Sequence, residues 1–404
     1  MDKERIIDRL FEPVKSRNIT LKNRIIRSAT YEGYGDHDGV PLPELANIYL
    51  NLAKGGVGTI ITGFAFVSQA GRAMQPGQCG IDSSSKIAPW RKILNKVHDS
   101  YPDVSLFMQI AHAGRQTKRK FTGFSAVGPS GRKCTYFKES VKTLNDNEIR
   151  EIITEFGEAA GRAREAGFDG IQVHAAHGYL IHQFLSPWTN TRQDKWSDGR
   201  LFLESIIENI HGKCGADFPV FVKLSWAEDN KPGINLNNSI QTVKSLENSG
   251  ADAVEISYGT MEFALNIIRG DCPIDTVLKV NPLFKPIPHF FCEIWKLFFL
   301  KKYLRKNIPF TENYNVDSAM EIKKSTTLPV FPVGGIRTAD NIIDVLNKGL
   351  DAVSLCRPLI CDPDLPLRIK NGKNSECINC NLCTVYCDST QPIRCYQRKK
   401  GEKS

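Results

Sequence analysis

Eight short runs of aliphatic and β-branched residues, each followed by a longer segment of helical periodicity, constrain the fold of this 404-residue chain more than any other feature. The runs are Arg24–Ala29, Val57–Gly63, Val104–Ile110, Gly170–Ala176, Val220–Ser225, Ala253–Gly259, Val330–Gly335 and Ala352–Arg357. They alternate little between apolar and polar residues, as parallel strands buried on both faces do. Eight such units in roughly 350 residues predict an α/β fold, a (β/α)8 TIM barrel, rather than an open doubly wound sheet. No GxGxxG motif opens an early helix, which argues against a Rossmann domain.

The segments between these runs have recognisable helix ends. Asn145 precedes an acidic first turn, as N-cap residues do, and Gly167 follows the last periodic residue of the same segment. The expected helices are Pro43–Lys54, Lys86–Ser100, Asp146–Ala166, Gly199–Gly212, Leu236–Ser249, Val316–Ser325, Thr338–Lys348 and Pro363–Asn371. We therefore expect a barrel domain over residues 1–371, with a long insertion at about 261–315 between strands six and seven, and a cysteine-rich tail at 372–404.

Composition and charge limit the class of protein. Hydrophobic residues make up 41% and charged residues 24% of the chain, which is typical of a globular protein and excludes a disordered one. The formal charge of +9 suits an anionic cofactor or substrate, but on a chain of this length it does not predict a nucleic-acid partner. No run approaches the 18 uninterrupted apolar residues of a membrane span, and the N-terminus has no signal-peptide core, so we expect no transmembrane segment and a cytoplasmic location.

Within the insertion, residues 287–306 combine aromatic and aliphatic side chains with several lysines and one arginine. This composition is found in helices that bind a membrane surface or dock a partner. It is also found in lid helices that pack an apolar side over a barrel mouth or a neighbouring subunit. We favour the lid, because insertions at this face of a barrel usually shape a substrate pocket.

Polar residues stand where the strands of such a barrel end, and this end carries the active site. Gln109 lies at the end of the third run, and Lys223 lies in the fifth. His174 lies near the end of the fourth run, and His177 and Tyr179 follow that run. Two imidazoles directed at one point suit hydrogen bonding to an oxygen that gains negative charge, and zinc binding is the competing interpretation. Tyr179 suits either a proton donor or a buried core tyrosine.

The last two strands end in residues that suit an anion. Gly334 and Gly335 close the seventh run, and Cys356 and Arg357 close the eighth. Paired glycines let backbone N–H groups approach a phosphate, and an arginine adds a forked cation. A tight turn with Arg357 in a surface ion pair fits the same residues equally well.

With these residues assembled, the chain closely resembles the Old Yellow Enzyme family of FMN-dependent NADH:flavin oxidoreductases. The stretches that carry the resemblance are Leu10–Pro13 with Ile19–Arg24, Gln109–Arg115, Val173–Gly199, Gly334–Arg337 and Arg357–Pro363. They extend over the whole barrel. The resemblance implies bound FMN, NAD(P)H as reductant, and a small enone or enoate substrate.

Position by position, the resemblance implies roles for residues already singled out. Gln109 would hydrogen-bond the pyrimidine side of the flavin, and Lys223 would lie near flavin N1 and O2. The segment at Ala29 and Thr30 would contact flavin O4, with Tyr31 as the alternative because the register there is unclear. The FMN phosphate would be held by Gly334, Gly335, Cys356 and Arg357.

The resemblance also implies a reaction in two halves. NAD(P)H would give a hydride to flavin N5, and the flavin would pass it to the β carbon of an α,β-unsaturated carbonyl compound. His174 and His177 would bind the carbonyl oxygen, and Tyr179 would protonate the α carbon. Two alternatives stay open: a trimethylamine dehydrogenase-like demethylase, and an electron-transfer protein fed by an external donor.

The tail resembles that of a subgroup with 2,4-dienoyl-CoA reductase and related enoate reductases. Cys377, Cys380 and Cys383 are spaced C-x2-C-x2-C, Cys395 follows after eleven residues, and Cys387 is extra. In that subgroup four such cysteines hold a [4Fe–4S] cluster, and zinc or free thiols are the alternatives here. Because the chain stops at residue 404, we expect the subgroup's second flavin and NADPH domains to be absent. A homo-oligomer is compatible with the sequence.

Overall fold

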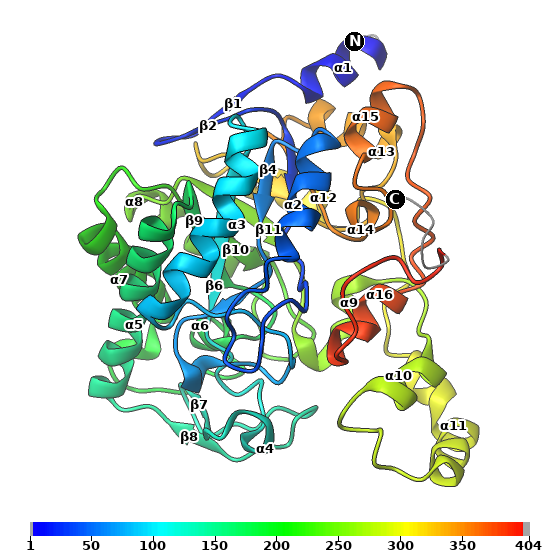
Figure 1. The fold of residues 1–404 in the computed structure, drawn as a ribbon. Coiled ribbons are helices and arrows are strands. Elements are labelled where there is room, and N and C mark those ends of the chain that lie inside the picture. Colours follow the sequence, from blue (N-terminus) through cyan, green and yellow to red (C-terminus); the bar gives the residue numbers. More distant parts are fainter. Residues whose placement is uncertain (1–2, 399–404) are drawn as a thin grey trace.

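The computed structural model describes residues 3–398, and its centre is a parallel barrel of eight strands surrounded by helices (Figure 1). The strands are β3 (Ile25–Arg27), β4 (Thr59–Ile61), β6 (Ser105–Ala111), β9 (Gly170–Ala175), β10 (Val220–Ser225), β11 (Ala253–Ser257), β12 (Val330–Pro332) and β13 (Val353–Leu355). They pair in the order β12-β11-β10-β9-β6-β4-β3-β13, and a parallel bridge between Val333 and Ser354 joins the two ends. The predicted (β/α)8 barrel is therefore confirmed.

The eight expected helices all form, with ends within a few residues of those predicted. They are α2 (Leu45–Lys54), α3 (Ile87–Ser100), α5 (Asp146–Ala166), α7 (Gly199–Cys214), α8 (Leu236–Asn248), α12 (Val316–Lys323), α13 (Ala339–Asn347) and α15 (Leu365–Lys370). In α5 the side chains of Asn145 and Glu148 each accept a hydrogen bond from the other's backbone N–H. This reciprocal cap explains why the helix begins where the sequence indicates. Gly167 ends it with a φ of 102°.

Shorter elements surround this repeat. The helices are α1 (Lys3–Leu10), α4 (Arg119–Thr122), α6 (Leu180–Leu185), α14 (Arg357–Cys361) and α16 (Leu382–Val385). The strands are β1 (Val14–Lys15), which pairs antiparallel with β2 (Thr20–Leu21), β5 (Ala65–Phe66), which pairs parallel with the end of β6, and β7 (Ala126–Gly128), which pairs with β8 (Val141–Thr143). Single 3-10 turns lie at Gln69–Gly71, Ser84–Lys86, Lys195–Ser197, Met261–Phe263 and Tyr386–Asp388.

Three phenylalanines fill the middle of the barrel. Phe107 and Phe221 stack with ring centroids 4.2 Å apart, and Phe331 meets the edge of Phe221 at 5.6 Å. All three are fully buried, and Ile26 and Ile61 complete the layer from the neighbouring strands. Apolar side chains therefore fill the barrel at this level, and the polar side chains of the site described below lie toward the C-terminal ends of the strands.

The insertion forms α9 (Ala264–Ile268), α10 (Ile274–Val280) and α11 (His289–Leu304), and α11 lies at the edge of the molecule, away from the barrel strands (Figure 1). Cys292 is the only buried residue described in α11. Within this chain α11 therefore does not pack its apolar side over the barrel mouth, which was one of the two forms of lid that we expected; packing against a neighbouring subunit stays a prediction. Between residues 3 and 398, no helix has the length and apolarity needed to cross a bilayer.

The tail runs back along the barrel and reaches its mouth. The backbone N–H of Ile393 donates to the carbonyl of Glu32, and α16 lies against α10. The carboxylate of Asp388 accepts hydrogen bonds from Gln75 Nε2 at 3.2 Å and from Asn281 Nδ2 at 2.5 Å. This side chain therefore ties the tail to the loop after β5 and to the insertion. Burial raises the pKa of Asp388 from its ordinary 3.8 to about 6.

We predict that Phe221→Ala lowers the free energy of unfolding by about 3–5 kcal/mol, because it removes the central ring of a closed aromatic layer. Urea-induced unfolding followed by fluorescence measures the loss. Phe290→Ala is the matched control, since that ring is 69% exposed on α11 and its loss should change stability little. Equal losses in the two variants would contradict the packed layer.

The raised pKa of Asp388 predicts a pH dependence of stability. Between pH 3.8 and about 6 the folded state holds a proton that the unfolded chain has lost, so this residue's contribution falls as pH rises through that window. Asp388→Asn cannot titrate, so the stability of the native protein relative to this variant should decline from pH 4 to about pH 7. Chemical unfolding of both proteins over this range measures the difference, and a difference that stays flat or rises with pH would contradict the raised pKa.

Candidate active site

The turn after β9 directs two imidazole rings at the same region. His174 belongs to β9, and His177 and Gly178 follow with φ angles of 60° and 78°. These left-handed conformations reverse the chain, and the two rings come to lie 5.2 Å apart between centroids at 75° to each other. The backbone N–H of His177 donates to Ser225 Oγ at 3.0 Å, and its carbonyl accepts from Gln116 Nε2 at 2.6 Å. The unusual backbone is thus held from both sides.

Both imidazoles are uncharged at neutral pH. Burial lowers the pKa of His174 and His177 well below the ordinary value, and the cation of Lys223 lowers both further. His177 Nε2 shares a hydrogen bond of 2.8 Å with Ser257 Oγ. His174 Nδ1 is buried and has no partner among the described residues. A buried nitrogen without a partner is rare in proteins, so a polar atom of a water or of a bound molecule would satisfy this one.

Tyr179 lies beside this pair. Its ring is 4.9 Å from the His174 ring and 5.3 Å from the Phe64 ring between centroids. Burial raises the pKa of the phenol above its ordinary value, and the nearby Asp388 and Cys387 of the tail raise it further. The hydroxyl therefore keeps its proton and can donate it to a neighbouring group.

A row of buried polar side chains crosses the barrel mouth beneath these rings. Gln109 Nε2 donates to Gln172 Oε1 at 2.7 Å, and Gln172 Nε2 donates to Glu255 Oε2 at 2.8 Å. Lys223 Nζ lies 3.4 Å from the same Glu255 oxygen and 2.8 Å from Ser28 Oγ. The other Glu255 oxygen, Oε1, is buried without a partner in the described part of the chain. A planar group with both donors and acceptors along one edge would satisfy this row.

Sequence reasoning found two members of that row, Gln109 and Lys223, and missed Gln172, Glu255 and Ser28. The sequence did contain an indication that Gln172 and Glu255 belong to the site. Both are polar residues inside runs that should be buried on both faces. A buried glutamate needs a partner, and a lysine on the adjacent strand was the candidate.

The residues at the ends of β3 and β13 lie together. Thr30 Oγ1 donates to the carbonyl of Ser28 at 2.9 Å and lies 3.1 Å from Cys356 Sγ. The hydroxyl of Tyr31 instead accepts from the backbone N–H of Gly77 at 2.8 Å. Ala29 packs against the apolar cluster of the barrel interior. The sequence analysis left Thr30 and Tyr31 as alternatives for the same contact. Of their two hydroxyls, only that of Thr30 lies between the ends of β3 and β13.

Gly334 and Gly335 have φ angles of 134° and 74°, which favour glycine. A Cβ on Gly334 would come within 2.4 Å of the Tyr314 ring, and one on Gly335 within 2.7 Å of the backbone at Asn313 and Thr311. Side chains are therefore excluded at both positions, as an anion-binding turn or a tight turn requires.

Arg357 is buried, so its interpretation as half of a surface ion pair is wrong. Its Nη1 donates to the carbonyl of Arg269 at 2.9 Å and to the side chain of Asn381. Both hydrogen bonds described for the guanidinium use this one nitrogen. No hydrogen bond is described for Nε or Nη2, so these two nitrogens are available to an anion.

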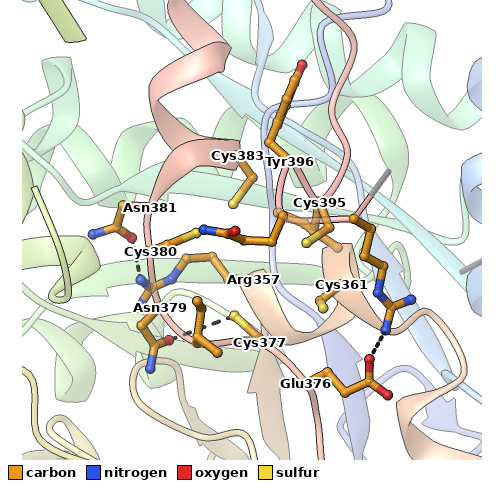
Figure 2. A pocket seen from close by; sticks show the side chains of 14 residues that line it. Arg357, Cys361, Glu376, Cys377, Asn379, Cys380, Asn381, Cys383, Cys395 and Tyr396 are labelled. Atoms are coloured by element: carbon orange, nitrogen blue, oxygen red, sulfur yellow. Dashed lines mark hydrogen bonds and ion pairs between the residues drawn. The ribbon is translucent and has the colours of Figure 1, made fainter. Parts of the chain in front are cut away.

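The four predicted cysteine ligands line one cavity of about 160 Å³ (Figure 2). Cys377, Cys380, Cys383 and Cys395 contribute to it, together with Arg357 and residues of α14. One of these is Cys361, which the sequence reasoning did not connect with the tail. Cys387 does not line the cavity. Within residues 3–398, no three Cys, His, Asp or Glu side chains lie close enough to hold a single metal ion.

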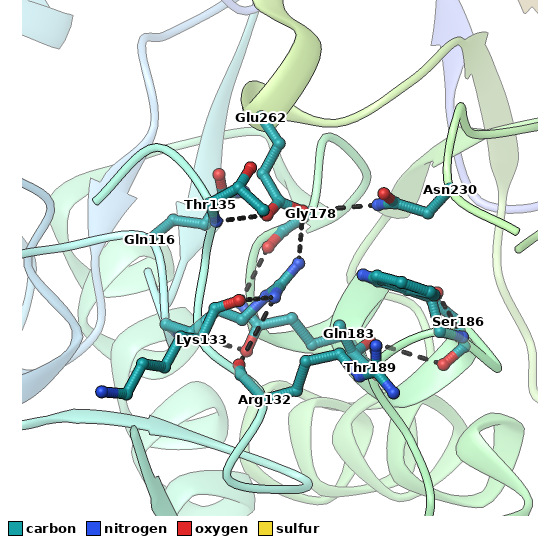
Figure 3. A network of polar contacts seen from close by, with 12 residues as sticks. Gln116, Arg132, Lys133, Thr135, Gly178, Gln183, Ser186, Thr189, Asn230 and Glu262 are labelled. Atoms are coloured by element: carbon teal, nitrogen blue, oxygen red, sulfur yellow. Dashed lines mark hydrogen bonds and ion pairs between the residues drawn. The ribbon is translucent and has the colours of Figure 1, made fainter. Parts of the chain in front are cut away.

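A buried ion pair joins loops near Gly178, in the turn after β9 (Figure 3). Arg115, after β6, contacts Glu262 at 2.5 Å, and its other terminal nitrogen donates to the carbonyl of Lys133 at 2.8 Å. Glu262 also accepts from the backbone N–H of Thr135 at 2.6 Å and from Asn230 Nδ2 at 3.3 Å. The pair therefore connects loops from three strands with the start of the insertion, and so fixes the wall of the site.

Comparison with known proteins gives relatives that share this barrel. The chain is 33% identical to an NADH oxidase of Thermoanaerobacter brockii over 385 residues, which are 94% of this chain and 53% of that protein. It is 34% identical to an NADPH dehydrogenase of Bacillus subtilis (strain 168) over 271 residues, 65% of this chain and 77% of that protein. The chain spans about half the length of the NADH oxidase and of a metal reductase of Desulforamulus reducens.

Solved structures agree on the fold. An Old Yellow Enzyme homologue from Zymomonas mobilis superposes with a TM-score of 0.70 at 24% identity, over 94% of this chain and 98% of that one. A histamine dehydrogenase from Rhizobium sp. 4-9 superposes with a TM-score of 0.80 at 22% identity, over 97% of this chain and 52% of that one. The model of the NADH:flavin oxidoreductase / NADH oxidase family matches residues 9–269. The chain therefore belongs to this family, the Old Yellow Enzyme family, as its motifs indicated.

Proposed function

We propose that this protein is an FMN-dependent oxidoreductase that uses NADH or NADPH to reduce the C=C bond of α,β-unsaturated carbonyl compounds. The observation that carries the proposal is the buried, unpartnered Nδ1 of His174, which lies in a neutral imidazole pair beside a protonated phenol. Membership of the family supports the use of a flavin and a nicotinamide.

The imidazole pair suits a carbonyl oxygen that gains negative charge. Each neutral ring carries one N–H, and two such donors aimed at one oxygen stabilise an enolate-like transition state without placing a full cation there. Because Ser257 occupies Nε2 of His177, Nδ1 of that ring is left for substrate. Ser225 and Gln116 hold the backbone of His177, so little reorganisation accompanies the reaction.

Tyr179 suits the transfer of a proton to the α carbon of the same substrate. Its raised pKa keeps the phenol protonated at neutral pH, and its ring lies next to that of His174. The apolar side chains around it, among them Phe64 and Ala113, exclude water from this proton. Reduction of the substrate by a hydride and this proton is balanced by oxidation of NAD(P)H to NAD(P)+.

The mouth of the barrel fits FMN. Gln109, Lys223 and Glu255 Oε1 offer donors, a cation and an unpartnered acceptor for a flat heteroaromatic ring. Thr30 lies at the adjacent strand ends, and the phosphate would be held by Gly334, Gly335, Cys356 and Arg357. When bound, FMN would supply the two-electron, hydride-transfer chemistry between NAD(P)H and the substrate.

We also propose that Cys377, Cys380, Cys383 and Cys395 hold a [4Fe–4S] cluster. A zinc ion would draw four thiolates to about 2.3 Å from one point, and the described cysteines do not converge in that way. A cluster binds each thiolate through a different iron and therefore fits cysteines spread around a cavity. No disulfide links any of the twelve cysteines, all of which lie in the described part of the chain, and this suits a reducing environment.

We predict that the double variant His174→Ala/His177→Ala keeps its flavin but loses at least about 100-fold in kcat/KM for 2-cyclohexenone, because both donors to the carbonyl oxygen are gone. The absorbance spectrum reports bound flavin, and stopped-flow mixing separates reduction by NADPH from reoxidation by the enone. Only reoxidation should slow.

His98→Ala is the matched control, since that imidazole pairs with Asp169 on the outside of the barrel. Retained enone turnover in the double variant would reject the assigned role. Native protein that NADPH does not reduce, but an external electron donor does, would favour the electron-transfer alternative.

The cluster gives a separate prediction. Protein purified without oxygen should contain about four iron atoms per chain. Cys380→Ser should lose most of this iron and the broad brown absorbance, because a cavity ligand is removed. Cys387→Ser should keep both, since that thiol does not line the cavity. Iron analysis and the visible spectrum measure this, and equal iron in all three proteins, or iron in none, would reject the cluster.

A further inference from the structure

Helix α11 carries its apolar side chains on the outside of the molecule. Leu297, Phe290 and Phe298 are 78%, 69% and 68% exposed, and Phe291 and Ile294 are exposed as well. These five positions recur at intervals of three and four residues, so they form one stripe along the helix. A surface helix of a globular protein normally turns such a stripe inward. Here the stripe faces solvent.

The opposite side of α11 holds the helix to the body. Cys292 is buried, and Trp295, Lys296 and Leu300 are half-buried on the same side. Lys296 contacts Asp275 of α10 at 2.7 Å and Glu293 at 2.6 Å. The helix therefore has a defined inner face, and turning the stripe inward would expose Cys292 and separate Lys296 from Asp275.

The segment that joins α10 to α11 is fixed to the barrel loops. Phe284 meets the ring of Tyr136 edge-on at 6.2 Å, and Asn281 Nδ2 donates to the Tyr136 hydroxyl at 2.9 Å. Leu283 packs on the apolar cluster of Met74 and Phe137. The exposed stripe is thus presented by an anchored segment.

Basic residues surround the stripe at its C-terminal end. Lys301, Lys302, Arg305 and Lys306 follow the aromatic residues, and Lys285 precedes the helix; all five are exposed. None has an acidic partner within ion-pair distance among residues 3–398, whereas Lys296 on the inner face has two. An excess of unpaired positive charge beside an apolar stripe is complementary to an anionic lipid surface.

We propose that α11 docks this protein on the surface of a membrane containing anionic lipids, with the helix lying in the plane of the headgroups. The stripe of Phe290, Phe291, Ile294, Leu297 and Phe298 would enter the boundary between headgroups and acyl chains. The basic residues would contact lipid phosphates. At 16 residues α11 is about 24 Å long, shorter than the hydrocarbon core of a bilayer, so the helix lies on the membrane and does not cross it.

A second segment supports this orientation. Phe121 and Phe124 are exposed next to the exposed Arg119 and Lys120, in and after α4. In Figure 1, α4 lies at the same lower end of the molecule as α11. Two aromatic and basic segments at one end favour a flat anionic surface over a second copy of this chain, which would bring like charges toward each other.

Vesicles containing equal amounts of phosphatidylcholine and phosphatidylglycerol test the proposal by co-sedimentation of the full chain with its cofactors. The native protein should bind them, and bind vesicles of phosphatidylcholine alone far more weakly. Leu297→Ser/Phe298→Ser should reduce the partition coefficient by about tenfold or more. Lys301→Gln/Lys302→Gln should reduce it about fivefold for each charge removed.

Leu367→Ser is the matched control, because Leu367 is a 42% exposed leucine on α15, at the opposite end of the molecule. It should bind as the native protein does, and all variants should keep their flavin content and thermal midpoint. Native protein that does not bind anionic vesicles, or a stripe variant that binds them normally, would overturn the proposal. So would a native dimer that the stripe variant converts to a monomer, since α11 would then be an interface between copies.

Discussion

The buried contact between Lys223 and Glu255 is the constraint on which the rest of the barrel mouth depends. The two charges lie 3.4 Å apart with almost no exposure to solvent, directly above the layer of Phe107, Phe221 and Phe331. Burying either charge alone would be strongly unfavourable, so each requires the other and the hydrogen bonds from Gln172 and to Ser28. The barrel therefore changes from apolar to polar within one residue layer.

This pair also sets the chemistry above it. The lysine cation disfavours a second positive charge nearby, and it lowers the pKa of both imidazoles, which burial has already lowered. The rings of His174 and His177 therefore stay neutral and act as hydrogen-bond donors, and the site does not carry two positively charged imidazoles. The same cation would stabilise negative charge on a reduced cofactor in the mouth. One buried ion pair thus serves both the substrate side and the cofactor side of the proposed reaction.

The eight units and the positions of Gln109, His174, His177 and Lys223 could be predicted from the sequence, because strand runs fix which residues meet at one end of a barrel. What could not be predicted depends on contacts between distant segments. Asp388 reaches Gln75 and Asn281 across three parts of the chain. Cys361 joins the tail cysteines at one cavity only because α14 lies beside the tail. The local periodicity of the sequence predicts neither the contacts of Asp388 nor the position of Cys361 beside the tail.

Helix α11 shows the same limit in another form. The sequence identifies which residues share a side of the helix, because that depends only on their spacing along it. It does not identify which side faces the protein, because that is decided by the neighbours. Here Asp275 pairs with Lys296 and the body encloses Cys292, so the side that carries Cys292, Trp295, Lys296 and Leu300 turns inward. Exposed aromatic rings contribute little to folding stability and favour self-association. Their presence on a helix anchored in this orientation is therefore best explained by a partner surface outside the fold.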